Sequence, residues 1–522
     1  MNKKKPKFES LLQTESLDGY PDGDAIQVIG TIQDVSYENN YLEGMNHALK
    51  LAKSIKKREF SKRHSAYLNY TIANIWFDRY KLKNPKKESW KWESEDYVQI
   101  IIYYRKALRD ILDSGIHNPL DKLYYSQITT NLSNNLSHLG RIVEAIEGWN
   151  RCLSLNSSFG MARGNLGHGL MQYSRIIYDP GHQAYLLREA HKHLKQGLTQ
   201  DITQEAKEGF TGCIDQIESL LSHEFINEDV DLNKWDLGAS KDEKDYRKWC
   251  LKNVLFLNPL NDFGNNTIAA TDILHLPDII TKIDEKPFHH GLFNVIKQEY
   301  VSARFLLFES IQLAQKGEQH FSDKNNHLVD TLDYSFHSLG IEKEKLAFRM
   351  AYSIFDKVAF YMNAYFKLGK AKDRVNFKNV WYVKNNGECR VRTEFNKYEN
   401  WPLRGLFWLS KDLFARNDEF KKCLEPDAKE LDSIRNHLEH KYLKVHMFGS
   451  GGSSPISSDS FAYSISRDDL HEKALRILKL SRSAIMYLVF AIHIEERMKR
   501  RNIDETKIGT IHTVELFDGH RH

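Results

Sequence analysis

The chain has 522 residues, a length that predicts roughly three domains, each able to bury its own core. Hydrophobic residues make up 41% and charged residues 28% of the sequence, which excludes a disordered chain and a Gly/Pro-rich low-complexity chain. The 5 cysteines lie far apart without a CxxC pair, which argues against a disulfide framework or a cysteine-rich zinc site and favours a reducing cytoplasm. A net charge of +4 permits an anionic partner without requiring one, so a local site must decide the function.

Residues 1–40 predict an N-terminal tail without a targeting segment. The first seven residues are largely basic, but polar sequence soon follows, so the apolar core of a signal peptide is missing. The longest apolar stretch, residues 484–494, contains no Asp, Glu, Lys or Arg but is shorter than the ~20 residues that span a bilayer. We therefore expect a cytoplasmic protein that does not contact a membrane.

Residues 41–222 show the apolar spacing of three and four that is typical of helices. Within them, the segment 132–136 (Leu-Ser-Asn-Asn-Leu) is similar to the segment 166–170 (Leu-Gly-His-Gly-Leu), which starts 34 residues later. That offset is the period of tetratricopeptide (TPR) repeats, so the region resembles a degenerate TPR-like solenoid, interrupted at residues 178–181. Such a stack implies a protein partner at its concave surface; the alternative is a helical layer that only packs on the rest of the chain.

Residues 223–288 predict an irregular but ordered connector, because Asn-Pro and Leu-Pro steps disfavour helix and aromatic residues recur between polar turns. Residues 289–500 then show four long helical patterns, the third of them in two parts. These patterns cover residues 293–314, 342–368, 403–414 with 427–440, and 468–500.

The C-terminal half also contains three shorter features. A small β-hairpin is expected around Asn385-Asn386-Gly387, because Asn-Gly suits a tight turn. A Gly/Ser-rich loop follows at residues 449–460, and the tail 501–522 includes a strand-like pattern at residues 510–517. The predicted fold class is therefore all-α, with N-terminal TPR-like helical repeats followed by a C-terminal helical bundle that carries a small β-hairpin insertion.

Several side chains that can act in catalysis lie close together in the segment Arg435-Asn436-His437-Leu438-Glu439-His440. On a helix, Asn436 and His440 stack at i, i+4, while Arg435 lies about 140° around from His440 and is long enough to lean across. We expect Glu439 to pair with Arg435, also at i, i+4. The pattern thus predicts a cation, an amide and an imidazole on one small patch.

RNA cleavage by the neighbouring 2′-hydroxyl requires such groups. A proton must leave the hydroxyl, another must reach the 5′-oxygen, and charge on the phosphoryl oxygens must be stabilised. His440 can move protons and Arg435 can hold phosphoryl oxygens in a bidentate fork. Because one histidine cannot readily act as base and acid together, a two-fold dimer is the natural way to complete the site.

The arrangement resembles the HEPN superfamily (higher eukaryote and prokaryote nucleotide-binding domains), and Arg435-Asn436-x3-His440 matches its Rx4–6H ribonuclease motif. The connector and first helical pattern look like a bacterial subfamily in which a repeat region precedes the HEPN domain. The resemblance implies a metal-independent endoribonuclease without a cofactor or metal site, an RNA substrate, a homodimer, and a toxin or anti-phage defence role. The implied roles are phosphate binding for Arg435, orientation for Asn436 and proton transfer for His440.

Three further residues are candidates for site-flanking or regulatory roles. Tyr442 completes an Arg-x4-His-x-Tyr form that resembles HEPN toxins silenced by nucleotidylation of that tyrosine; the alternative is a packing tyrosine. His437 either flanks the site or faces solvent. Asp356, in an apolar helix, either lies near the catalytic residues or forms a core salt bridge.

Other classes of enzyme lack their minimal motifs in this sequence. It contains no GxxxxGK[ST], GxGxxG, HExxH or EF-hand pattern, and its scattered histidines show no metal-ligand spacing on one element. The main rival is a non-catalytic protein whose HEPN-like domain dimerises or binds a nucleotide while the repeats scaffold partners. A third candidate is an antitoxin-like or immunity protein, which relieves growth arrest.

Overall fold

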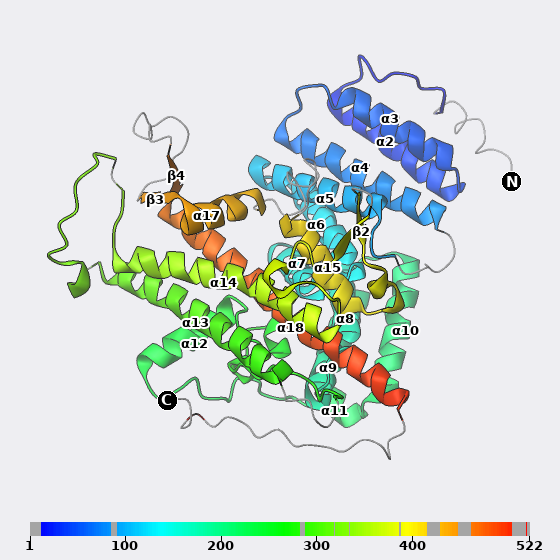
Figure 1. Ribbon diagram of the computed structural model, residues 1–522. Coiled ribbons are helices and arrows are strands. Elements are labelled where there is room, and N and C mark those ends of the chain that lie inside the picture. Colours follow the sequence, from blue (N-terminus) through cyan, green and yellow to red (C-terminus); the bar gives the residue numbers. More distant parts are fainter. Residues whose placement is uncertain are drawn as a thin grey trace.

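The computed structural model describes residues 12–84, 91–281, 288–317, 319–333, 335–385, 388–414, 428–446, 461–503 and 518. This part of the chain is predominantly helical and has two small strand pairs, which confirms the predicted all-α class (Figure 1). The predicted Gly/Ser-rich loop and the strand-like pattern of the C-terminal tail lie outside the described residues, as does the basic start of the chain.

The N-terminal half is a stack of helices in which neighbours along the chain pack together. Its helices are α2 (Asp22–Glu38), α3 (Leu42–Ile55), α4 (Lys62–Lys83), α5 (Glu95–Ser114), α6 (Pro119–His138), α7 (Ile142–Leu155), α8 (Gly160–Ser174), α9 (Pro180–Leu198) and α10 (Gln204–Leu220). The two similar segments of the sequence fall in α6 and α8, the first helices of successive pairs, so the stack is compatible with TPR-like repeats. The prediction of an N-terminal tail is wrong for residues 22–38, because these residues form α2, which buries one apolar face against α3 and α4.

Short polar side chains mark where many of these helices begin. Ser94 accepts a hydrogen bond from the Tyr97 N–H at the start of α5, and Asn118 accepts one from the Asp121 N–H at the start of α6. Pro119 follows Asn118 in the first turn, where its missing N–H costs nothing. Local sequence therefore helps to set where these capped helices begin.

The connector contains more helix than its sequence predicts. It includes α11 (His223–Asn227) and α12 (Lys241–Lys252), followed by the 3-10 turns η1 (Pro259–Asp262) and η2 (Thr267–Ala269). The segment around η1 is buried, with Leu257, Asn258 and Asn261 each at most 1% exposed. An ordered connector is what the sequence predicts, but α12 was not expected.

The C-terminal half contains the four predicted long helical patterns. Its helices are α13 (Phe288–Lys316), α14 (Leu339–Tyr365), α15 (Trp401–Phe414), α17 (Ala428–His440) and α18 (Arg467–Arg501), with short 3-10 turns η3 (Phe321–Asp323), η4 (Lys372–Arg374) and η5 (Thr393–Lys397). The predicted hairpin forms from β1 (Tyr382–Asn385) and β2 (Glu388–Val391), which pair antiparallel. A second pair was not predicted: β3 (Tyr442–His446) and β4 (Ala462–Ser466) run parallel.

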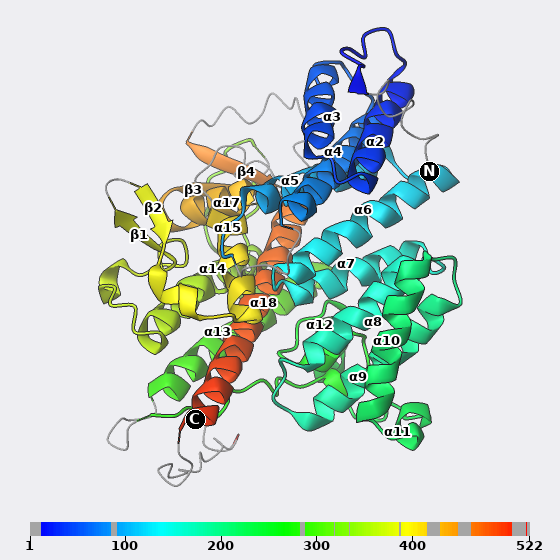
Figure 2. The same ribbon diagram turned by 90° about the vertical axis from the view of Figure 1, so that its right-hand side faces the viewer.

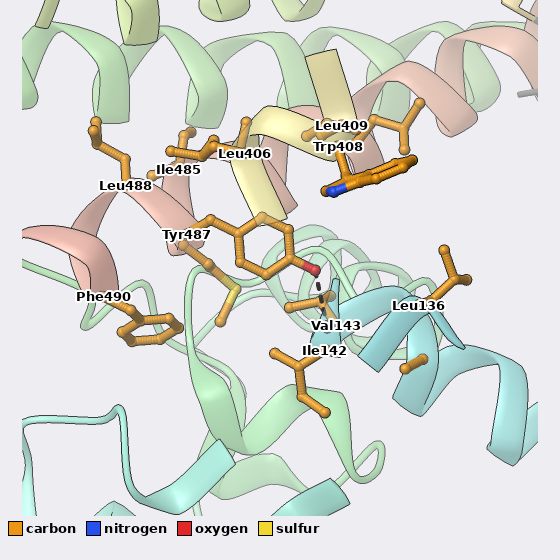
Figure 3. Close-up of a cluster of buried hydrophobic side chains, with 14 of the residues drawn as sticks. Leu136, Ile142, Val143, Leu406, Trp408, Leu409, Ile485, Tyr487, Leu488 and Phe490 are labelled. Atoms are coloured by element: carbon orange, nitrogen blue, oxygen red, sulfur yellow. Dashed lines mark hydrogen bonds between the residues drawn. The ribbon is translucent and has the colours of Figure 1, made fainter. Parts of the chain in front are cut away.

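The two halves share one continuous hydrophobic core. Figure 2 shows α18 running through the molecule with α6 to α9 against one side. In Figure 3, Ile142 and Val143 of α7 face Tyr487 and neighbouring side chains of α18, and the Tyr487 hydroxyl accepts a hydrogen bond from the Val143 N–H at 3.0 Å. The chain itself therefore covers this face of the N-terminal helical stack.

Buried ion pairs reinforce the contact between the halves. Asp412 of α15 accepts hydrogen bonds from Arg105 of α5 and from Arg141 before α7, and all three side chains are at most 8% exposed. Arg482 of α18 pairs with Asp262 of η1 at 2.6 Å, with each side chain 1% exposed. Removing one partner of such a pair leaves an unpaired buried charge, which makes the contact costly to break.

Within the described part of the chain, only α18 is long and apolar enough to cross a membrane. The protein buries 83% of its apolar window. A core helix of a folded protein has this property, so α18 is compatible with a protein outside the membrane.

Candidate active site

The motif helix α17 lies at one end of the C-terminal bundle, beside β3 and β4 (Figure 1). Leu431 and Ile434 are fully buried and turn one face of the helix toward the bundle, where it packs on α14 and α15. The predicted motif residues occupy the last two turns of this helix, and β3 begins two residues after it ends.

The Arg435 side chain leans onto the neighbouring helix α14. Its guanidinium carbon lies 5.6 Å from the ring centroid of Tyr352, and its Nη1 donates to Asn436 Oδ1 at 3.4 Å. Asn436 in turn donates from Nδ2 to Asp432 Oδ2 at 3.2 Å. The structure thus brings Arg435 and Asn436 together, as predicted, on a half-buried surface that presents both a cation and an amide.

The expected pairing of Arg435 with Glu439 is wrong. Glu439 instead accepts from Arg349 of α14, with Arg349 Nε 3.2 Å from Glu439 Oε1. On the other side, Lys473 of α18 pairs with Glu430 of α17 at 3.0 Å. These two ion pairs tie α17 to α14 and α18 and leave the Arg435 guanidinium without a carboxylate partner among the described residues.

His440 is the last residue of α17 and is exposed. Within the described residues it makes no hydrogen bond or ion pair, and none joins it to Arg435. The imidazole is thus available to a ligand at the surface, one helical turn beyond Asn436. Tyr442 follows at the start of β3, 42% exposed, with the Lys444 ammonium 5.2 Å from its ring centroid.

His437 is turned away from the motif patch and packs on β4. Its Nδ1 donates to the Ser433 carbonyl oxygen at 2.7 Å, and its ring centroid lies 5.2 Å from that of Tyr463. Because one nitrogen and one ring face are engaged, His437 supports the helix rather than facing open solvent.

Asp356 of α14 binds the loop at Phe377. Its Oδ1 accepts from the Phe377 N–H at 3.0 Å, and it forms no salt bridge within the described residues. Asp356 nevertheless acts on Tyr352 electrostatically. Burial raises the pKa of the Tyr352 phenol, and the charges of Asp432 and Asp356 raise it further, whereas Arg435 lowers it. It contributes to the electrostatics of the patch without touching Arg435.

Tyr352, Asp432 and Arg349 are the site residues that the sequence analysis missed. Tyr352 and Asp356 are spaced at i, i+4, as are Asp432 and Asn436, and that regularity is the only signal the sequence offers. In the described residues, no group of three or more His, Cys, Asp or Glu side chains is arranged to hold a metal ion.

The structure is all-α, and the comparison with family models identifies a HEPN domain at its C-terminus, preceded by a helical region. Residues 280–495 match the family model described as LA2681-like HEPN. The match includes all six predicted site residues and supports the predicted resemblance to the HEPN superfamily; a HEPN domain indicates a nuclease or nucleotide-related role. No curated protein and no solved structure matches the chain.

Proposed function

We propose that the protein is a metal-independent endoribonuclease. The observation that carries the proposal is the Arg435-Asn436-x3-His440 motif on the accessible end of α17, inside the segment that matches the HEPN family model. Support also comes from the geometry around Arg435, whose guanidinium is oriented by a ring and an amide but has no described carboxylate partner. Such a cation is available to bind a phosphate diester.

The proposed reaction is an internal transfer of the phosphoryl group. A base removes the proton of the 2′-hydroxyl, the 2′-oxygen forms a bond to phosphorus, and the bond from phosphorus to the 5′-oxygen breaks. An acid gives a proton to that 5′-oxygen, so the products carry a 2′,3′-cyclic phosphate and a 5′-hydroxyl, and no water is consumed. Arg435 stabilises charge on the phosphoryl oxygens, His440 moves a proton, and Asn436 orients the guanidinium.

We further propose that a second copy of the chain completes the site. The segment before α14 carries Leu328, Val329 and Leu332, which are 58%, 87% and 77% exposed, and Phe461 before β4 is 83% exposed. The Phe336 N–H donates to the Val445 carbonyl oxygen at 2.7 Å, which joins this segment to β3 beside the motif. A two-fold contact over these apolar side chains would bring the two His440 imidazoles toward one RNA strand.

A cytoplasmic toxin or anti-phage defence role is the biological setting we propose. Because α18 covers one face of the repeats, a regulatory protein partner would have to use another face. The repeats contact the core of α18, and α14 and α18 hold α17 through ion pairs. A partner bound to the repeats could therefore influence the site through the packed helices.

Tyr442, accessible beside the motif, would be open to covalent modification by a partner enzyme.

Cleavage of a labelled RNA pool in EDTA tests this function. The purified wild-type protein and a His223→Ala control, which changes an exposed histidine on α11, should both cleave, while His440→Ala should lose at least 100-fold in rate. Products with 5′-phosphate ends, or a strict requirement for Mg²⁺, would overturn the mechanism. Equal activity of His440→Ala would overturn the role of this residue.

A further inference from the structure

A polar hollow lies in the N-terminal stack, away from α17. It has a volume of about 240 Å³ and opens between α2, α4, α5 and α6. Its walls are rich in amide side chains, supplemented by one carboxylate, one phenol and one phenyl ring: Gln33, Asn74, Phe77, Asp78, Tyr104, Asn131, Asn134 and Asn135. A hollow lined in this way is hydrated or occupied by a polar ligand, because an empty cavity requires apolar walls.

One acceptor in this hollow lacks the donor that its burial requires. Asn135 is 3% exposed, and its Nδ2 donates to the Asn131 carbonyl oxygen at 2.8 Å. Its Oδ1 is buried and has no hydrogen-bond partner. A buried amide oxygen without a donor is rare in folded proteins, so Asn135 contributes to the lining an acceptor that the protein itself leaves unpaired.

Several donors of the lining are already used within the protein. Gln33 Nε2 donates to Asp78 Oδ2 at 2.9 Å, and the Tyr104 hydroxyl donates to Asn74 Oδ1 at 2.6 Å. Burial raises the pKa of Tyr104, so the phenol keeps its proton and adds no negative charge. The Tyr104 proton is therefore not available to Asn135 Oδ1 or to a ligand.

Asp78 gives the hollow a negative charge that is only partly neutralised. Burial raises the pKa of its carboxyl, while Gln33 and Lys81 lower it. The Lys81 ammonium lies 4.4 Å from the ring centroid of Phe77, at the edge of the lining and exposed to solvent. A second cation inside the hollow would favour the ionised carboxylate, whereas a phosphate or carboxylate ligand would be repelled.

We propose that this hollow binds an alkylammonium or guanidinium group. The cation would donate to Asn135 Oδ1 and Asp78, and its aliphatic stem would lie against Phe77. The volume is smaller than the roughly 300–1,000 Å³ of drug-sized pockets, which suits a single cationic side chain or a small amine rather than a nucleotide. The source is either a lysine or arginine side chain of a bound protein segment or a free polyamine, and this inference does not depend on the ribonuclease proposal.

Titration calorimetry on the full chain tests the proposal. The probes are spermidine, a short peptide with one central arginine, and inorganic phosphate at matched ionic strength. Spermidine or the peptide should bind the wild-type protein, and Asp78→Asn should weaken that binding at least tenfold. The control is Asp113→Asn, which removes a carboxylate that is 47% exposed and paired with Lys62 outside the hollow; it should bind as the wild type does.

The outcomes separate the two sources and can overturn the proposal. Binding of spermidine alone supports a free amine, and binding of the peptide alone supports a protein segment. Binding of neither cation, equal binding by Asp78→Asn, or preferential binding of phosphate would overturn it. Asp78→Asn should fold normally, because asparagine can still accept from Gln33 and avoids a buried charge, and circular dichroism would verify this.

Discussion

Arg435 is positioned by an aromatic ring on one helix and by an amide on its own. The Tyr352 ring faces its guanidinium at 5.6 Å, and Asn436 Oδ1 accepts from Nη1 at 3.4 Å. A lysine would keep the charge but lose the planar fork that these contacts orient and that binds two phosphoryl oxygens at once. The geometry of the cation therefore matters more than its charge.

Arg435→Lys tests this residue-level claim. We expect kcat/KM for RNA cleavage to fall at least tenfold, which is about 1.4 kcal/mol of transition-state stabilisation. The matched control is Arg151→Lys on α7, whose partly exposed ion pair with Glu147 lies outside the motif helix and its neighbours; it should change the rate by less than about twofold. Equal losses in both variants would indicate that Arg435 acts only as a surface charge.

The sequence predicted that Arg435 and Asn436 share one small patch, because both lie on one helix at a spacing that local geometry determines. It could not predict that Tyr352 lies beneath Arg435, since α14 and α17 meet only through tertiary packing. It also assigned Glu439 to the wrong arginine for this reason: a local i, i+4 pair competes with Arg349 of another helix, and the packing decides between them.

At the scale of elements, the turn between α6 and α7 is pressed against the start of α15. Gly140 has φ +86°, and a Cβ placed there would lie 2.7 Å from the Gly405 nitrogen and would also meet the Trp401 carbonyl oxygen. The Trp401 Nε1 donates to the Ser137 carbonyl oxygen at 2.7 Å across the same contact. A side chain at residue 140 would have to separate the N-terminal helical stack from the C-terminal half.

We therefore expect Gly140→Ala to destabilise the protein by about 2 kcal/mol or more, from the left-handed backbone and the backbone clash together. Gly209→Ala is the matched control, because Gly209 lies inside α10 with nothing within 4 Å of an added Cβ. That change should be neutral or stabilising by about 0.5–1 kcal/mol. Chemical denaturation measures both variants, and an unaffected Gly140→Ala would contradict the close contact.

His493 of α18 makes another contact between the two halves sensitive to pH. Its ring centroid lies 5.8 Å from that of Tyr178 in the repeat region, and burial, with a smaller contribution from Arg497, lowers its pKa to about 4. The folded protein thus holds this histidine neutral, while the unfolded chain binds a proton below about pH 6.5. Its contribution to stability is fully present above that pH and is lost as the pH falls toward 4.

The expected loss from His493 between pH 7 and pH 5 is about 1 kcal/mol, allowing for its partial exposure. His493→Gln should remove this part of the pH dependence, so its free energy of unfolding should fall less than that of the wild type over the same range. An identical pH dependence in the two proteins would show that His493 is not the group responsible.

At the scale of the whole molecule, the two halves are packed as one body around α18, and this was the least predictable feature. Helical periodicity predicted the long helices and the Asn-Gly turn signal predicted the hairpin, because both depend on neighbouring residues. The contact of Arg141 with Asp412 joins residues 271 positions apart, and nothing in the local pattern of either residue indicates the other. The parallel pairing of β3 with β4 was missed for a related reason, since two five-residue strands separated along the chain have little individual signal.

The proposed dimer is also a property of the whole molecule. Leu332→Asp should disrupt the two-fold contact and yield a monomer with little ribonuclease activity, because the charge would be buried against the second copy. Leu220→Asp, at an equally accessible leucine on α10 that is 68% exposed, should leave both mass and activity unchanged. Light scattering coupled to size exclusion measures the mass; a Leu332→Asp protein that remains dimeric would place the interface elsewhere.

The most direct test of the ribonuclease mechanism blocks the attacking group of the RNA itself. Once a cleavage site is mapped, the same RNA is synthesised with a single 2′-O-methyl group on the nucleotide before the scissile bond and incubated with the protein in EDTA. The proposed mechanism predicts that cleavage at that bond disappears while neighbouring sites are still cut, leaving 2′,3′-cyclic phosphate ends. Continued cleavage at the methylated position would show that another nucleophile attacks and would contradict the account.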